Sequence, residues 1–95
     1  MTIRWAKDAT QQLVAAHAYI AADNPTAADR LLLRITQAVK HLAHHPLAGR
    51  EGRVGNTREL VIVNTPYIVA YRLKDRGTIE ILAILQGKRR WPDSF

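Results

Sequence analysis

The chain has 95 residues, enough for one hydrophobic core and little more, because a domain this short buries only about two-thirds of its unfolded surface. Its composition, 47% hydrophobic and 23% charged, is that of a globular protein and excludes a disordered chain. It contains no cysteine, which excludes disulfides, a thiol nucleophile and a zinc site with thiolate ligands. The net charge of +6 favours acidic partners such as nucleic acid or an acidic protein, although it would also help to keep a small protein soluble.

No part of the sequence predicts a membrane segment. The apolar runs are far shorter than the roughly 20 residues needed to span a bilayer. Residues 1–5 also lack the apolar core of a secretion signal. We therefore expect a cytoplasmic protein that makes no contact with membranes.

The first quarter of the chain predicts a strand and a helix. Residues 2–6 alternate apolar and polar side chains, which predicts a short strand. Asp8 is then a candidate N-cap, with Gln11 placed to complete a capping box. The apolar spacing beyond it predicts a helix that runs to about Ala22.

A second helix gives the clearest periodic signal in the sequence. Asn24 can accept a hydrogen bond from the free amides of its first turn, and Pro25 suits the first helical position. Its apolar residues recur at three- and four-residue steps and form one stripe, made of Ala28, Leu31, Leu32, Ile35, Val39 and Leu42. The segment His44–Pro46 should end the helix, because the residue before a proline disfavours helical geometry. So short a link between the two helices predicts an antiparallel hairpin.

The second half of the chain predicts a loop and three strands. Residues 47–56 contain three glycines among charged residues, which is typical of a mobile loop. Residues 57–63, 67–74 and 78–86 are rich in β-branched and apolar side chains and predict strands, with a hairpin turn at Gly77. The last strand is apolar on both faces, which favours an interior position in the sheet.

The predicted order of elements is β-α-α-β-β-β. This order indicates an α+β fold in which a helical hairpin packs on one face of a small, mostly antiparallel sheet. The sequence shows no linker, repeat or low-complexity tract, so we expect residues 1–95 to form one domain.

The sequence contains no recognisable catalytic or cofactor motif. His41 and His45 lie one helical turn apart, a spacing that could hold a metal ion, but no cysteine or close carboxylate supplies further ligands. Histidines at this position also interact favourably with the end of a helix. No glycine-rich turn joins a strand to a helix, and the only serine, Ser94, lies in the tail. We therefore predict neither a cofactor nor a bound metal.

Basic and aromatic side chains are concentrated on and beside the predicted sheet. Tyr67 and Tyr71 share one face of their strand, and we expect both to be core-edge residues. The cations are Arg58, Arg72, Lys74 and a group of three, Lys88, Arg89 and Arg90, that stands next to Trp91. Such side chains can grip phosphates, or they can form a solvated rim. For the three that leave the last strand together, a binding role is favoured.

Three segments, taken in order, resemble the carboxy-terminal half of the RelE/ParE toxin superfamily. They contain Gly52-Arg53-Val54 with Thr57-Arg58-Glu59-Leu60, then Pro66-Tyr67-Ile68-Val69-Ala70-Tyr71-Arg72, then Ile79-Glu80-Ile81-Leu82-Ala83-Ile84-Leu85-Gln86-Gly87-Lys88-Arg89. The helical hairpin resembles the amino-terminal half. The resemblance implies the toxin of a bacterial type II toxin–antitoxin pair, neutralised when a cognate antitoxin folds over its helices and sheet. It also implies that operator DNA is contacted only through the antitoxin.

The superfamily contains two mechanisms, and this sequence departs from the nuclease one. RelE-like members cleave mRNA on the ribosome with basic and acid–base side chains from the sheet and the tail. Here residues 60–63 contain no lysine, and Gln86 stands where histidine is frequent. Ile68 follows Tyr67 where nucleases often have arginine, and the tail has neither tyrosine nor histidine. These departures favour the ParE-like branch, whose members poison DNA gyrase.

Two sets of candidate site residues follow from the resemblance. For gyrase binding without bond-making chemistry, the set is Arg50, Arg53, Lys88, Arg89, Arg90 and Trp91. For the alternative, a ribosome-dependent mRNA endonuclease, the set is Arg89 with Arg58, Tyr67 or Gln86. Arginine can stabilise phosphate charge there, but it is a poor proton acceptor. A third interpretation is a non-toxic chain that only binds its antitoxin.

Overall fold

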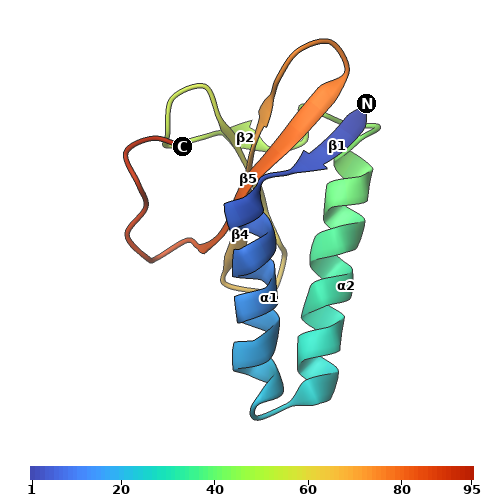
Figure 1. Cartoon of the computed structure of the whole chain (residues 1–95), viewed down its shortest axis with the longest axis vertical. Helices are drawn as coiled ribbons and strands as arrows, with labels where there is room; N and C mark the ends of the chain where they lie inside the picture. The colour runs from blue at the N-terminus through green and yellow to red at the C-terminus, as the bar shows by residue number, and fades with distance from the viewer.

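Two antiparallel helices lie side by side against a five-stranded sheet in the computed structural model, which describes all 95 residues (Figure 1). In chain order the elements are β1 (Thr2–Trp5), α1 (Lys7–Ala21), α2 (Pro25–Leu42), β2 (Arg50–Glu51), β3 (Arg58–Val61), β4 (Tyr67–Leu73) and β5 (Thr78–Gln86). The predicted α+β fold, a helical hairpin on a mostly antiparallel sheet, is confirmed. The strand β2 is an addition that the sequence did not predict.

The strand order β1-β5-β4-β3-β2 places the first strand of the chain beside the last one. β1 runs parallel to β5, whereas every other pair of neighbours is antiparallel. β5 therefore has a partner on each side, as its two apolar faces predicted. Its pairing with β4 extends from Tyr67 opposite Gln86 to Leu73 opposite Ile79, with a bulge after Ala70.

The junction between the helices forms as the sequence predicted. The Asn24 side chain accepts a hydrogen bond of 3.0 Å from the Ala27 amide, and Pro25 is the first residue of α2. A capping oxygen satisfies a backbone donor that the helix itself leaves free, and proline has no amide to satisfy at that position. α2 ends at Leu42, earlier than predicted. Beyond it, the backbone amides of His44 and His45 both donate hydrogen bonds to the His41 carbonyl.

The predicted capping box of the first helix is wrong. α1 begins at Lys7 after an extended Ala6, and no side chain caps it. The reason is that the Ala6 amide donates to the Ile81 carbonyl at 2.9 Å, so the chain stays bonded along β5 until the helix starts. Asp8 lies in the first turn instead, where its charge suits the positive end of the helix dipole.

The core lies between the helices and the sheet. β4 contributes Tyr67, Val69 and Tyr71, which alternate along the strand, and Tyr71 has no exposed surface. α2 contributes the buried part of its apolar stripe, Ala28, Leu31, Ile35, Val39 and Leu42. Leu32 borders this stripe and is only half-buried. Tyr67 and Tyr71 were predicted at the edge of the core, and their burial places both within it. Each fully buried large side chain stabilises the fold by about 1.5–3 kcal/mol.

Residues 47–56 are not wholly irregular, so the prediction of a mobile loop is wrong at its centre. Arg50 and Glu51 form β2, which pairs antiparallel with the first two residues of β3. A strand of two residues leaves no alternating pattern to read in a sequence. No helix of the structure has the length and apolar character required to cross a membrane.

Candidate functional site

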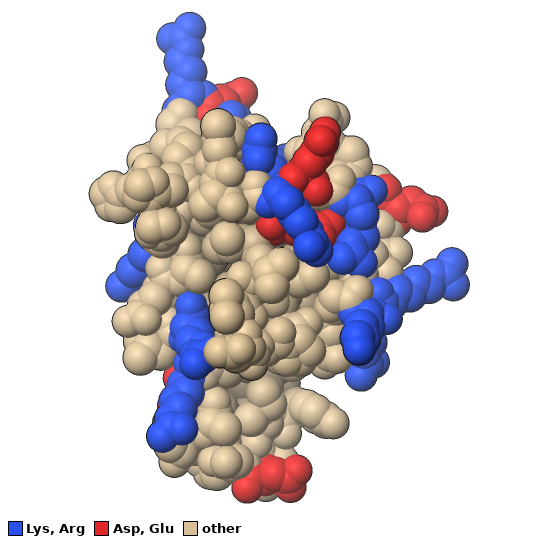
Figure 2. Space-filling view, turned by 180° about the vertical axis from the view of Figure 1, so that it is seen from behind, with Lys and Arg blue, Asp and Glu red and all other residues tan.

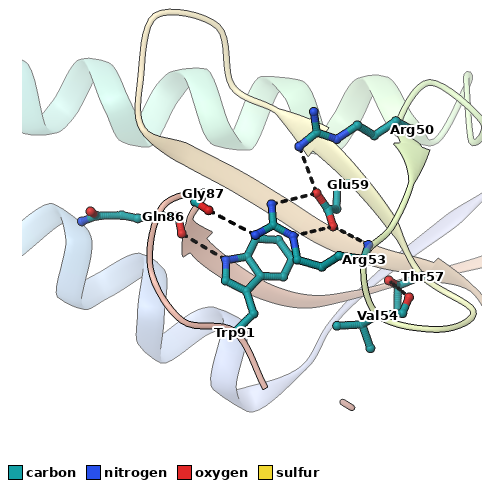
Figure 3. A network of polar contacts seen from close by, with 8 residues as sticks. All are labelled: Arg50, Arg53, Val54, Thr57, Glu59, Gln86, Gly87 and Trp91. Carbon is teal, nitrogen blue, oxygen red and sulfur yellow. Dashed lines mark hydrogen bonds and ion pairs between the residues drawn. The ribbon is translucent and has the colours of Figure 1, made fainter. Parts of the chain in front are cut away.

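A buried carboxylate, Glu59, anchors the edge of the sheet where the chain leaves β2 and enters β3. Its neighbour Leu60 packs against the core, so Glu59 points to the opposite face of the sheet, and it is only 2% exposed. Arg53 donates to it from its amide at 2.7 Å, from Nε at 3.1 Å and from Nη2 at 3.3 Å. Arg50 adds a fourth hydrogen bond of 3.1 Å (Figure 3).

These donors decide the charge of Glu59. Burial acts to raise the pKa of the carboxyl group, because it removes the charged form from water. The hydrogen bonds from the side chain and the backbone of Arg53, with that from Arg50, outweigh burial and lower the pKa below its usual value. Glu59 is therefore a carboxylate held as an anion, and its oxygens are engaged by the arginines.

Arg53 connects Glu59 to the end of the chain. Its Nη1 donates to the Gly87 carbonyl at 3.1 Å, and its guanidinium lies 3.7 Å from the centre of the Trp91 ring. Trp91 in turn donates from Nε1 to the Gln86 carbonyl at 3.1 Å. We call Arg50, Arg53, Glu59 and Trp91 the Glu59 clasp; Figure 3 shows how it joins the loop after β2, the strand β3 and the tail after β5.

The loop that carries Arg53 is closed by its own backbone. The Gly52 amide donates to the Thr57 carbonyl at 2.8 Å, and the Thr57 hydroxyl donates to the Val54 carbonyl at 2.6 Å. Asn56 has a φ of 62°, the left-handed conformation that asparagine tolerates. A Cβ on Gly52 would lie 2.8 Å from the Thr57 carbonyl oxygen, so the position has room only for glycine.

Tyr71 holds the other end of this segment to the core. Its hydroxyl donates to the Pro46 carbonyl at 2.8 Å and accepts from the Gly49 amide at 2.8 Å. Burial raises the pKa of Tyr71, against the opposing effects of the Gly49 amide and the nearby charge of Arg58. Arg58 donates to the Gly49 carbonyl at 2.8 Å, so this candidate nuclease residue also serves to fix the segment.

The three cations after β5 are placed differently from Arg50 and Arg53. Lys88, Arg89 and Arg90, which we call the basic cluster, are exposed and form no ion pair within the chain. Figure 2 shows cations projecting on the side of the molecule where the tail leaves the sheet. Of the predicted target-binding residues, the structure therefore leaves three free for a partner and uses Arg50, Arg53 and Trp91 for internal contacts.

The four candidate nuclease residues do not all converge. Tyr67, Gln86 and Arg89 line one groove of about 410 Å³ between α1 and the end of β5. Tyr67 offers it little surface, because the residue is only 6% exposed. Arg58 lies on another strand with its guanidinium on the Gly49 carbonyl, and it does not line this groove.

Sequence reasoning missed Glu59, which the structure places at the centre of the site. The available signal was weak: one acid in a strand of apolar residues, shortly after a glycine-rich loop with two arginines. The histidines form no larger site, since His41 and His45 stack with ring centres 4.3 Å apart and His17 hydrogen-bonds Asp29 at 2.9 Å. No group of three or more possible metal ligands is present in the chain.

Comparison with known proteins extends over nearly all of the chain. The family model of the ParE toxin of type II toxin–antitoxin systems, parDE, matches residues 3–91. The Sinorhizobium fredii protein Y4kP, whose name describes it as a toxin, is 43% identical over 90 residues, which cover 95% of this chain and 92% of that protein. The toxin RelE2 of Caulobacter vibrioides is 36% identical over 85 residues, covering 90% and 93%.

A solved structure agrees with these matches. The chromosomal ParDE toxin–antitoxin system from P. aeruginosa contains a chain that superimposes with a TM-score of 0.80 at 27% identity. The match covers 90% of this chain and 95% of that one. The chain therefore belongs to the ParE toxin family and is the toxin component of a type II toxin–antitoxin system, with a cognate antitoxin as its partner.

Proposed function

We propose that this toxin acts in the cytoplasm by binding and poisoning DNA gyrase, without itself making or breaking a covalent bond. The observation that carries the proposal is the contrast between the basic cluster and its surroundings. The cluster is exposed and forms no ion pair, whereas the carboxylate of the clasp, Glu59, is buried and fully engaged by arginines. The cluster therefore offers charge for binding, and the clasp carboxylate beside it is not free to accept a proton.

The family and the sequence both support a binding role over cleavage. The family match is to ParE toxins, and Ile68 and Val61 stand on a sheet face where a nuclease would need polar side chains. Exposed guanidinium and ammonium groups also attract an acidic partner from a distance, which speeds encounter. A cognate antitoxin that covers the basic cluster would block this binding.

The test is a gyrase supercoiling and cleavage-complex assay with purified toxin, with and without antitoxin. Wild-type toxin should block supercoiling or trap broken DNA, and antitoxin should reverse the effect. Alanine at all three positions of the basic cluster should raise the toxin concentration required by about tenfold. The matched control replaces Lys7, Lys40 and Arg76, three exposed cations elsewhere, and should leave the activity unchanged. Unaffected gyrase at a large excess of folded wild-type toxin would rule the proposal out.

One observation favours a second candidate, a ribosome-dependent mRNA endonuclease. Tyr67, Gln86 and Arg89 share a groove, and one similar protein carries the name RelE2. In this case translated mRNA would be cut in the presence of the toxin, and the cleavage would be lost in Arg89→Ala. Normal growth of cells that overproduce the toxin without antitoxin would contradict both candidates. Antitoxin binding would then be the one function left.

A further inference from the structure

The Glu59 clasp contains a buried charge, which a fold accommodates only where the groups that bond to it are held in place. Glu59 is the one charged residue among those that the structure buries. Removing the Glu59 carboxylate from water carries a large penalty, which its partners Arg50 and Arg53, themselves 58% and 39% exposed, must offset. The best-attested use of such buried ionic groups is to fix one geometry among several.

The geometry that the clasp fixes is that of the tail. All three nitrogens of the Arg53 guanidinium are used: Nε and Nη2 on Glu59, and Nη1 on the Gly87 carbonyl. Its face lies against Trp91, which also bonds back to the Gln86 carbonyl. Because the planar guanidinium of Arg53 is hydrogen-bonded along its edge and stacked on its face, it can adopt only one orientation. The part of the tail that it contacts is therefore held in one place.

The basic cluster lies between the two points that Arg53 holds. Gly87 directly precedes the cluster and Trp91 directly follows it, so both of its ends rest on the same side chain. Within this closed segment, the Arg89 amide donates to the Gln86 carbonyl at 3.1 Å. Gly87 is in turn seated on the sheet, since its amide donates to the Pro66 carbonyl at 3.0 Å. The cluster is thus carried on a short loop that is closed through the clasp.

We infer that Glu59 and Arg53 are positioning residues: they present the basic cluster to the target in a preformed conformation and do not themselves contact it. This inference rests on the proposed function in one respect only, that the target binds the basic cluster. A preformed loop binds more tightly because its residues are already ordered before the partner arrives.

The sign of one substitution separates this inference from a simple effect of charge. Glu59→Gln keeps the size of the side chain and removes one negative charge beside the cations. Charge alone predicts that a partner attracted to the cluster binds this variant more tightly, since the local positive potential rises. Loss of positioning predicts the opposite, about tenfold weaker binding expressed mainly as faster dissociation.

The experiment compares Glu59→Gln and Arg53→Lys with Glu80→Gln as the matched control. Glu80 pairs with Arg72 at 2.7 Å near the start of β5, so its substitution makes the same charge change far from the tail. The first readout is the rate of trypsin cleavage within residues 88–90 of the free toxin, together with Trp91 emission in a Trp5→Phe background. The second is affinity for gyrase, and the circular dichroism spectrum and thermal melt of each variant report that it is folded.

The clasp variants should be cleaved at least about tenfold faster in the tail and should bind gyrase about tenfold more weakly, while Glu80→Gln behaves like wild type. The inference would be overturned if the clasp variants matched wild type in tail cleavage and Trp91 emission. It would also be overturned if they bound gyrase as tightly as wild type or more tightly. If Glu59→Gln lowers the folded fraction, Trp91→Ala breaks the stacking from the half-buried tail, and the rate of tail cleavage by trypsin then decides whether the clasp orders the cluster. If wild-type toxin ignores gyrase, the proposed function fails, while the tail readouts still decide whether the clasp orders the cluster.

Discussion

Replacing Tyr71 with phenylalanine removes a single oxygen atom from the interior of the fold. That hydroxyl donates to the Pro46 carbonyl and accepts from the Gly49 amide, each at 2.8 Å. Tyr71 has no exposed surface and Gly49 is buried, so water has no direct route to the amide that loses its partner. The aromatic ring stays in place, and the substitution therefore tests the two hydrogen bonds with little change in packing.

The expected effect follows from the two groups left without partners. A buried donor with no acceptor costs about 1–3 kcal/mol, and the carbonyl of the half-buried Pro46 adds about 1 kcal/mol, because water can reach it in part. Tyr71→Phe should therefore lower the free energy of unfolding by about 2–4 kcal/mol. In a domain of this size each kcal/mol shifts Tm by about 4–8 °C, so Tm should fall by at least about 8 °C.

Urea unfolding followed by circular dichroism, with thermal melts beside it, measures this loss. The matched control is Tyr19→Phe, because Tyr19 is 76% exposed and the same atom is removed from contact with water. The control should change the free energy of unfolding by less than about 0.5 kcal/mol. If Tyr71→Phe changed it no more than the control does, the Tyr71 hydroxyl would not hold residues 46–49, and the reasoning would be refuted.

Three further predictions concern the helix junction, the loop and the clasp. Asn24→Ala removes the oxygen that accepts from the Ala27 amide and should lower the free energy of unfolding by about 1 kcal/mol. Asn24→Ser keeps a side-chain oxygen and should retain most of that stability. Equal melting temperatures for the two variants would contradict the capping role of Asn24. Gly52→Ala should destabilise by about 1–3 kcal/mol, because its Cβ would lie 2.8 Å from the Thr57 carbonyl oxygen, and an unchanged urea midpoint would argue against this. Burial acts to raise the pKa of Glu59 but its arginine donors lower it below 4.5, so its stabilising contribution is complete above pH 4.5 and is lost as the pH falls through the folded-state pKa. Between about pH 7 and pH 3, stability should therefore fall more steeply in wild type than in Glu59→Gln; parallel curves would show that Glu59 does not carry this dependence.

The elements that the sequence predicted well are those that depend on neighbouring residues. Asn24 and Pro25 act within a single helical turn, and the stripe of α2 needs only its own spacing to define a buried face. The apolar faces of β5 indicated an interior strand for the same reason, because burial on both sides selects the residues of one segment. The superfamily was likewise predicted from the order of such segments.

Only the tertiary structure decided the features that join distant segments. β2 exists because two residues meet β3, and α1 begins at Lys7 because the chain up to Ala6 remains bonded to β5. Glu59 can be buried as an anion because Arg50 and Arg53 from the preceding segment reach its oxygens, and Arg53 in turn contacts Trp91 of the tail. A sequence shows that these charges and rings are present, but their interaction depends on distances set by the pairing of strands. For this reason the sequence could not show that Arg50 and Arg53, which it predicts to contact a target, also bind an internal carboxylate.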